Sequence, residues 1–305
     1  MMARFRDQDV QDLESASSAA ADDKQTPLHD RSIGEIIRDT RNLTAEQVER
    51  VLEHQQATGV RFGEAAIALG LVSADDVLFA LAQQFHYPYA PEERRGASPE
   101  LVMLNQPFSV QAEAFRAIRS QVTMRLYGGT EPRSSLAVIS PDSGDGKSYF
   151  SANLAVALAQ LGGRTLLVDA DMRGPRLHEV FNTGNDSGLS GILSGRSQAR
   201  VIQRIDLVPG LFLLPVGTIP PNPLELIERP AFGLLMRELS GKFDHVVVDS
   251  PAAEYGADAG VIAARCGAAL VVARKNRSRT AALQDLVASL AESPAKLAGV
   301  ILNEF

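Results

Sequence analysis

The 305-residue sequence predicts an α/β fold, in which a mostly parallel sheet is covered by helices on both faces, preceded by a small helical repeat domain. Two observations carry this prediction. From Ser134 onward, short continuous apolar runs alternate with helical stretches, which is typical of parallel strands buried on both faces. Before residue 90, apolar residues at helical spacing recur in two copies that are offset by 29 residues.

The composition excludes several classes of protein. A single cysteine cannot form an internal disulfide, and this fits a reducing compartment. No apolar run approaches the roughly 18 residues of a membrane-spanning helix, and the first residues lack the apolar core of a secretory signal. The net charge of −7 argues against generic nucleic-acid binding. Residues 1–104 hold 10 basic and 18 acidic residues, so the acidity belongs to the first third.

Four segments follow from these patterns. Residues 1–30 contain few large apolar side chains and are predicted to be a disordered tail, with a loosely docked helix as the alternative. Residues 31–89 form the repeat domain. Residues 90–109 mix proline, glycine and charge, as expected of a linker. Residues 110–305 form the α/β domain, which begins with a helix from Val110 to about Tyr127.

Each repeat copy is predicted to be a short helix, a turn and a longer helix. Gly34-Glu35 in the first copy recurs as Gly63-Glu64 in the second. Thr44 and Ser73 are suitable N-cap residues for the longer helices, because a Gln or an Asp follows three positions later in the manner of a capping box.

The α/β part contains six predicted strands and a helix from Tyr149 to Leu161. In open sheets of this kind, ligands bind at the carboxyl ends of the strands. The functional site is therefore predicted at that edge. The predicted strands are Leu136–Ser140, Thr165–Asp169, Leu211–Pro215, His245–Asp249, Ala269–Ala273 and Gly299–Leu302.

A phosphate-binding loop, or P-loop, follows the first predicted strand. Residues 140–148 match the pattern G-x-x-x-x-G-K-[ST] except at its first glycine, where the chain has Pro141. Glycines 144 and 146 let backbone N–H groups surround phosphate oxygens, and the following helix directs its positive dipole end at the same anion. Lys147 is predicted to reach the β- and γ-phosphates, and Ser148 to bind Mg²⁺. A chance glycine-rich turn is the alternative, and the flanking strand and helix argue against it.

Acidic residues end two further predicted strands. Asp169 ends the second strand and Asp171 lies two residues later, and Asp249 ends the fourth strand. Like charges at one sheet edge are costly unless a cation shares them, and Mg²⁺ would do so. Each aspartate alone could cap a strand end, but three behind a P-loop predict a Mg-nucleotide site.

These residues resemble a known family, the bacterial tyrosine kinases of the polysaccharide co-polymerase type, over about residues 105–305. The resemblance rests on the loop Gly144–Ser148 and on the motifs D-x-D-x-R at Asp169–Arg173 and apolar-D-x-P ending at Pro251. With the repeat domain in front, the chain is most similar to stand-alone chain-length-determinant kinases of exosortase-linked gene clusters. The partitioning and division-site ATPases of the same P-loop NTPase fold are the rival, but they carry an early loop lysine where this chain has Asp142.

The resemblance implies ATP and Mg²⁺ as cofactors, and it assigns roles. Asp169 would orient and deprotonate the attacking tyrosine hydroxyl, and Lys147 would neutralise charge on the transferred phosphoryl group. Ser148, Asp171 and Asp249 would hold the metal. The implied nucleotide-binding residues are Ser143, Gly144, Asp145, Gly146, Lys147, Ser148, Tyr149 and Asn303.

The resemblance also implies partners. Glu113, Arg116 and Arg119 match an E-x-x-R-x-x-R segment that pairs neighbouring subunits in a ring, with a solvated helix face as the alternative. A transmembrane co-polymerase would bind this chain through its cytoplasmic tail, so that a cytoplasmic protein becomes peripheral to the inner membrane. The exopolysaccharide chain length or export would then be the regulated process.

Family members usually carry a tyrosine-rich tail, which is not seen at the end of this sequence. The acceptor is therefore expected on another protein or elsewhere in this chain. A non-kinase ATPase switch and a nucleotide-binding adaptor are the alternative functions. The five tyrosines are Tyr87, Tyr89, Tyr127, Tyr149 and Tyr255.

Residues 32–55 and 61–84 resemble the tandem motifs of the N-terminal domain of type II secretion ATPases, some of which bind cyclic di-GMP. The first copy departs from the motif, with Arg41 where a glycine is expected. A protein-docking module is the alternative to a cyclic di-GMP site. The motif residues that would contact this ligand are Arg61, Gly63, Gly70 and Gln84.

The neighbouring residues indicate the roles of two further features, a cysteine and a basic run. Cys266 precedes an apolar strand without a histidine or second cysteine nearby, which predicts a packing residue and not a nucleophile. The basic run Arg274–Arg279 follows a strand end, where it would contact nucleotide, acidic lipid or a partner, or else be a solvated loop.

Overall fold

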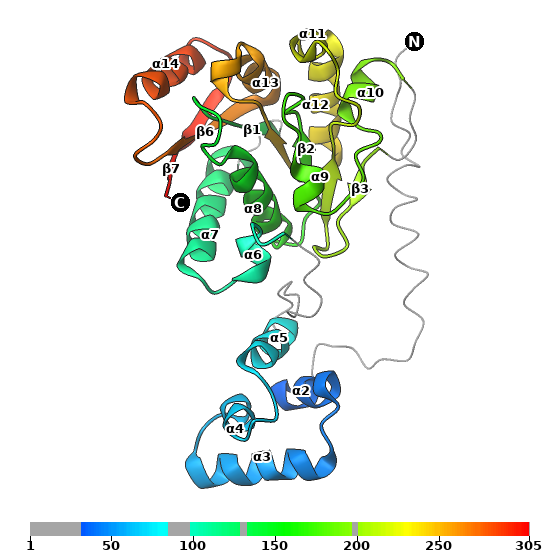
Figure 1. Ribbon diagram of the computed structural model, residues 1–305, viewed down its shortest axis with the longest axis vertical. Helices are drawn as coiled ribbons and strands as arrows, with labels where there is room; N and C mark the ends of the chain where they lie inside the picture. Colours follow the sequence, from blue (N-terminus) through cyan, green and yellow to red (C-terminus); the bar gives the residue numbers. More distant parts are fainter. Residues whose placement is uncertain (1–31, 85–97, 129–132, 197–200, 305) are drawn as a thin grey trace. The chain divides into compact units, whose positions relative to one another are not determined.

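The computed structural model describes residues 32–84, 98–128, 133–196 and 201–304. The predicted tail at 1–30 and residues 90–97 of the predicted linker lie outside these ranges. The chain divides into two compact units, a helical one before residue 97 and an α/β one after it. Both units are drawn in Figure 1.

The helical unit has the predicted helix–turn–helix pattern in both copies. The Thr44 hydroxyl accepts from the Gln47 backbone N–H, and the Gln47 side chain accepts from the Thr44 N–H. Ser73 and Asp76 form the same reciprocal pair in the second copy. Each longer helix is therefore started by a capping box, as predicted. The helices are α2 (Ile33–Arg41), α3 (Ala45–Thr58), α4 (Phe62–Ala68) and α5 (Ala74–Gln84).

Small residues let the four helices pack closely in this unit. Helix α2 packs on α5, and α3 packs on α4. The core includes Ile37 and Val51, which are fully or almost fully buried. Gly63 faces Val77 so closely that a Cβ atom at position 63 would lie 2.6 Å from a Val77 methyl carbon. The glycine at this position is thus required by packing of α4 on α5.

The α/β unit contains a seven-stranded sheet with the order β3-β4-β2-β5-β1-β6-β7 (Figure 1). Every neighbouring pair is parallel except β3 with β4, so the predicted fold class is confirmed. The strands are β1 (Ser135–Ile139), β2 (Thr165–Asp169), β3 (Gln203–Arg204), β4 (Leu211–Leu214), β5 (His245–Asp249), β6 (Gly267–Arg274) and β7 (Lys296–Asn303).

The six predicted strands are all present, and the differences lie at the edges of the sheet. Strand β3 was not predicted, because its two residues are polar and lie partly exposed. Strand β7 begins at Lys296, earlier than the predicted start at Gly299. The prediction missed its first residues because this edge strand is half-exposed and its apolar run is interrupted. Only strands buried on both faces produce the continuous apolar runs on which the prediction depended.

Alternate residues of the central strands contribute to two separate cores. Ala137 and Ile139 of β1 face one cluster, and Leu136 and Val138 face the other. The first core is covered by α10 (Leu189–Leu193), α11 (Pro223–Glu228), α12 (Pro230–Lys242), α13 (Asp258–Cys266) and α14 (Thr280–Ala291). The second is covered by α6 (Val102–Asn105), α7 (Val110–Val122), α8 (Lys147–Ala159) and α9 (Leu177–Val180).

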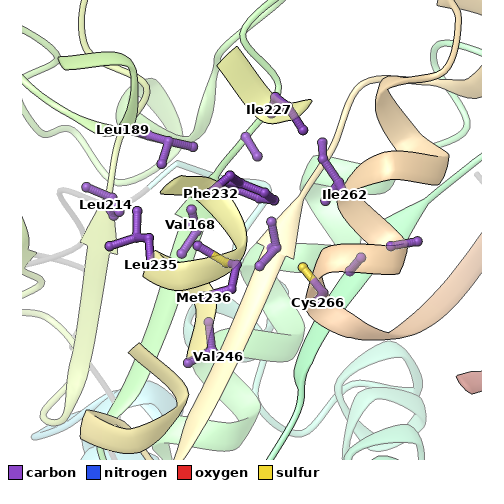
Figure 2. Packing of buried hydrophobic residues seen from close by; sticks show 14 of the residues in the cluster. Val168, Leu189, Leu214, Ile227, Phe232, Leu235, Met236, Val246, Ile262 and Cys266 are labelled. Atoms are coloured by element: carbon purple, nitrogen blue, oxygen red, sulfur yellow. The ribbon is translucent and has the colours of Figure 1, made fainter. Parts of the chain in front are cut away.

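Figure 2 shows part of the first core, where Phe232 and Met236 of α12 and Ile262 of α13 pack over Val168 and other strand residues. Cys266 lies in the same cluster and is buried. Burial raises the pKa of its thiol well above the ordinary range. The interpretation of this cysteine as a packing residue is confirmed.

Residues 98–109, predicted as the end of the linker, instead belong to the α/β unit. Leu101, Met103 and Leu104 are buried against the second core, and the Met103 N–H donates to the Asn153 side chain of α8 over 3.1 Å. The prediction was wrong here because this apolar run is too short to show a period and is flanked by proline, glycine and charge. The predicted helix at 110–127 is present as α7 followed by a π-helical turn, η3 (Thr123–Tyr127).

Among the described residues, no helix is both long and apolar enough to cross a bilayer.

Candidate functional site

The phosphate-binding loop connects β1 to α8, as predicted. Gly144 and Gly146 have φ values of +79° and +92°, a region that residues with a side chain rarely adopt. Their conformation turns the chain tightly before Lys147, the first residue of α8. Both Lys147 and Ser148 are almost completely buried at the helix N-terminus. This arrangement directs backbone N–H groups, the helix dipole and an ammonium group at one place, which suits a polyphosphate.

Hydrogen bonds of the buried Asp145 stabilise this loop. It is fully buried, and its carboxylate accepts from the Asp142 N–H over 3.0 Å and from the Ser278 hydroxyl over 2.8 Å. The side-chain amide of Asn303 donates to the Asp145 carbonyl over 3.1 Å. Asp145 and Asn303, both predicted to contact nucleotide, thus have contacts that hold the loop in shape.

Two of the predicted aspartates lie side by side at the carboxyl edge of the sheet. Asp169 on β2 and Asp249 on β5 are paired in register, and both are fully buried. Asp169 accepts from the backbone N–H groups of Asp171 and Leu177, each over 3.2 Å. One Asp249 oxygen accepts from the Ser151 hydroxyl over 3.0 Å, and the other has no hydrogen-bond partner among the described residues.

The protonation of this aspartate pair is strongly perturbed. Burial, and then the charge of Asp249, raises the pKa of Asp169 well above its ordinary value. Burial also raises the pKa of Asp249 to about 6, although the Ser148 hydroxyl and the Lys147 ammonium group oppose this change. Two carboxylates that share a buried edge favour the binding of a cation or the uptake of a proton.

A cavity of about 960 Å³ opens beside the loop. Seven of the predicted site residues line it, namely Ser143, Gly144, Gly146, Lys147, Ser148, Tyr149 and Asp171. Asp169 and Asp249 are not among the lining residues, and they form the buried support beneath this edge. The volume suits a small-molecule ligand of nucleotide size.

Arginines make much of the remaining wall, together with Glu100 and Tyr255. Arg173 forms an ion pair of 3.0 Å with the buried Asp258, and Arg176 pairs with Glu100. Arg274 donates to the Gly144 carbonyl over 3.4 Å. Arg277 lies beside the same glycine, so that a Cβ at position 144 would be 3.0 Å from its Nη1 atom.

Contact with nucleotide was one of the predicted roles of the run 274–279, and two of its residues, Arg274 and Arg277, line the cavity together with Arg173. Because Arg173 is the last residue of the D-x-D-x-R motif, its place at the site could have been inferred from the sequence. Glu100 and Tyr255 had no local signal, because only the packing of distant segments brings them here.

The predicted oligomerisation residues make contacts within the chain on α7. Arg116 pairs with Glu113 over 2.8 Å and also donates to the Pro107 carbonyl. Arg119 donates to the Ala157 carbonyl at the end of α8 over 2.9 Å. Of the three side chains, Glu113 is the most exposed to solvent. Pairing of subunits through this segment stays a prediction.

The helical unit has its own hollow of about 410 Å³, lined by the start of α2 and by Phe62 and Gln84. Of the four residues predicted to contact cyclic di-GMP, only Gln84 lines it. Gly63 allows helix packing, and Gly70 has a φ of +67° in the turn after α4. Binding of cyclic di-GMP stays a prediction.

No group of three or more histidine, cysteine or carboxylate side chains in the described ranges is arranged to hold a metal by itself. Magnesium at nucleotide sites commonly takes one or two carboxylates together with phosphate oxygens.

Comparison with known proteins gives one consistent family. Residues 136–305 match the CobQ/CobB/MinD/ParA nucleotide-binding domain. The putative tyrosine-protein kinase EpsB of Ralstonia solanacearum is 36% identical over 192 residues, covering 62% of this chain and 26% of EpsB. The chain thus spans about a quarter of the length of that relative.

Shorter proteins are matched over most of their length. The putative tyrosine-protein kinase CapB of Staphylococcus aureus is 32% identical over 216 residues, which cover 70% of this chain and 92% of CapB. Among solved structures, the kinase domain of the Escherichia coli tyrosine kinase ETK is similar, with a TM-score of 0.64 and 29% identity. That match covers 69% of this chain and 82% of the ETK domain.

Proposed function

Since the chain belongs to the CobQ/CobB/MinD/ParA nucleotide-binding family, and within it to the bacterial tyrosine kinases, we propose that it transfers the γ-phosphoryl group of ATP to tyrosine. One observation carries the proposal: the phosphate loop with Lys147 and Ser148 shares a cavity with Asp171, and the buried Asp169–Asp249 pair supports the same edge. Such a site positions a nucleotide and stabilises developing charge, which is most of what phosphoryl transfer needs.

Lys147 supports transfer through its position. Lys147 is the first residue of α8, directly after the loop, and it lines the cavity. There it would neutralise charge that develops on the transferred group and on the leaving β-phosphate. The adjacent arginines at positions 274 and 277 add positive charge to the same wall.

The donor set fits Mg²⁺, because one buried oxygen of Asp249 makes no hydrogen bond among the described residues. Ser148 and Asp171 both lie close enough to shift the pKa of Asp249. Ser148, Asp171 and Asp249 would hold the ion. When bound with ATP, the ion would supply positive charge that neutralises the phosphates.

Asp169 is proposed as the base that orients and deprotonates the acceptor hydroxyl. Its raised pKa supports this role, because a carboxylate with a raised pKa takes up a proton more readily. The N–H groups of Asp171 and Leu177 fix its orientation.

The cellular role proposed for this activity is control of exopolysaccharide chain length or export. The partner would be the cytoplasmic tail of a transmembrane co-polymerase, which would hold the chain at the inner membrane from the cytoplasmic side. Support for this proposal comes from the family and from the resemblance of residues 105–305 to kinases of that system.

The test is phosphotyrosine formation and ATP turnover with Mg-ATP and the partner tail. Lys147→Met is expected to lower both rates about 100-fold or more, because a preorganised charge at the transferred group is removed. Lys242→Met is the matched control, since Lys242 pairs with Glu238 within α12. Undiminished turnover in Lys147→Met would refute the proposal. Phosphate release without any phosphotyrosine would favour an ATPase switch instead.

A further inference from the structure

The wall of the nucleotide cavity contains a tyrosine of the same chain. Tyr255 lines the cavity together with Lys147, Ser148 and Asp171. The residue is 51% exposed to solvent. It ends η4 (Ala253–Tyr255), the short helical turn that follows β5 and the Asp249-Ser250-Pro251 motif.

Hydrogen bonds fix this turn directly on the phosphate loop. The Ala253 N–H donates to the Ser140 carbonyl over 2.9 Å, and the Glu254 N–H donates to the Pro141 carbonyl over 3.0 Å. In return, the Ser143 N–H donates to the Glu254 carboxylate over 2.6 Å. The backbone that carries Tyr255 is therefore positioned by the loop that would bind the phosphates.

The other two described tyrosines are less suited to accept a phosphoryl group. Tyr127 is partly buried with its hydroxyl covered and its ring 4.9 Å from the His245 ring, it does not line the cavity, and burial raises its pKa strongly. Tyr149 lines the cavity but packs edge-on against Phe115 in the second core, with ring centroids 5.9 Å apart. Among the three described tyrosines, Tyr255 alone is both exposed and part of the cavity.

The same wall would stabilise the product. Arg173, Arg176, Arg274 and Arg277 line the cavity with Tyr255. Arginine forms strong charge-assisted hydrogen bonds with phosphate oxygens. A phosphoryl group on Tyr255 would therefore lie among cationic side chains.

We infer that Tyr255 is an intramolecular phosphoacceptor, modified by the ATP that its own chain binds; this inference rests on the proposed kinase function. The phenolic oxygen attacks the γ-phosphorus, and the bond from that phosphorus to the β–γ bridging oxygen breaks. ADP leaves with the bond electrons. The phenolic proton passes to the carboxylate of Asp169, the base of the proposed function.

The experiment maps phosphotyrosine after the full chain is incubated with Mg-ATP and an added poly(Glu,Tyr) peptide. An isotopically heavy Lys147→Met chain is mixed in, so that its own Tyr255 reports transfer between chains. We expect phosphate on Tyr255 of the wild-type chain and its complete absence from the heavy chain. Tyr127→Phe is the matched control and is expected to keep the label on Tyr255.

Other outcomes separate this inference from the proposed function. Phosphotyrosine only on the peptide, or on Tyr87 or Tyr89, would overturn the inference and keep the kinase function. Label on Tyr255 of the heavy chain would overturn the intramolecular route. No phosphotyrosine on any chain or peptide would overturn both proposals.

Discussion

At the scale of single residues, the site is built at a cost in stability. Asp169 and Asp249 are adjacent, fully buried carboxylates, and burial raises the pKa of each. An ionised carboxylate in such a place is less favourable than in the unfolded chain. Groups of this kind are retained where a ligand or a reaction needs them, so the pair indicates function and not structural support.

We predict that Asp249→Asn stabilises the nucleotide-free protein at pH 8 by on the order of 1 kcal/mol. The pKa of Asp249 is about 6 in the folded protein and ordinarily near 3.8, so its ionised form above pH 6 costs stability. Lowering the pH from 8 to 5 should therefore stabilise the wild-type chain relative to the variant. Urea denaturation in EDTA measures both effects, and a variant less stable than wild type at pH 8 would contradict the prediction.

At the scale of helices and strands, equivalent positions of the two repeats have different roles. Gly34 and Gly63 occupy the same place in their copies. Only at Gly63 would an added Cβ atom lie too close to a neighbouring side chain, that of Val77. Arg41, which departs from the expected glycine, donates to the buried Asp76 over 2.7 Å and so links α2 to α5. Some departures from the repeat pattern therefore serve the packing of this unit.

Substitution of the two repeat glycines should separate packing from helix propensity. Gly63→Ala is expected to destabilise the helical unit by about 1–3 kcal/mol, because the new methyl group would lie 2.6 Å from a Val77 carbon. Gly34→Ala is the matched control, since its Cβ would be 3.6 Å from Phe62, and it should be neutral or stabilising by up to about 1 kcal/mol. Circular dichroism during urea titration of the full chain checks this, and equal effects of both changes would contradict it.

The Arg41–Asp76 pair should make this unit sensitive to acid. Burial tends to raise the pKa of Asp76, but hydrogen bonds from Ser73 and Arg41 outweigh it and lower the pKa below 3.8. The stabilisation is therefore complete above that pH and is lost as the pH falls through the folded value. Arg41→Ala should cost about 1 kcal/mol at pH 7 and progressively less under acid.

The control for this pair is Arg38→Ala, because Arg38 and Asp39 form an exposed ion pair on the same helix. Exposed pairs contribute little, so the control should change stability by less than about 0.5 kcal/mol at pH 7. Urea titrations at pH 7 and pH 3 provide the comparison. A cost for Arg41→Ala that is as large at pH 3 as at pH 7 would contradict the assignment.

At the scale of the whole molecule, a nucleotide should stabilise one unit and not the other. The cavity is lined by residues of the α/β unit. A ligand that binds only the folded state stabilises it by about 2.7 kcal/mol at one hundred times its dissociation constant. We expect Mg-ATP to slow hydrogen exchange in β1, β2, β5 and α8, with no change in α2 to α5.

Removal of the metal tests the same linkage. Excess EDTA should reduce the protection of the α/β unit, because the Asp169–Asp249 pair would again lie beside phosphates without a shared cation. Lys147→Met should show little protection under either condition. Equal protection with and without EDTA would exclude a metal-dependent site.

Features that depend on residues close together in the chain could be predicted from the sequence. A few neighbouring residues are enough to identify the turn glycines and the lysine of the phosphate loop. The same is true of the aspartates at strand ends and of the N-caps Thr44 and Ser73. Strands buried on both faces also have an unmistakable apolar pattern. The fold class and the centre of the site were therefore predictable.

The way in which distant segments complete that site could not be predicted from the sequence, because it depends on how the chain packs. Glu100 reaches the cavity because residues 101–104 pack on the second core, and Tyr255 does so because its turn is hydrogen-bonded to the phosphate loop. The polar pair of β3 becomes a strand only beside β4. These arrangements arise from contacts between residues far apart in the chain, and such contacts leave no periodicity in the local sequence.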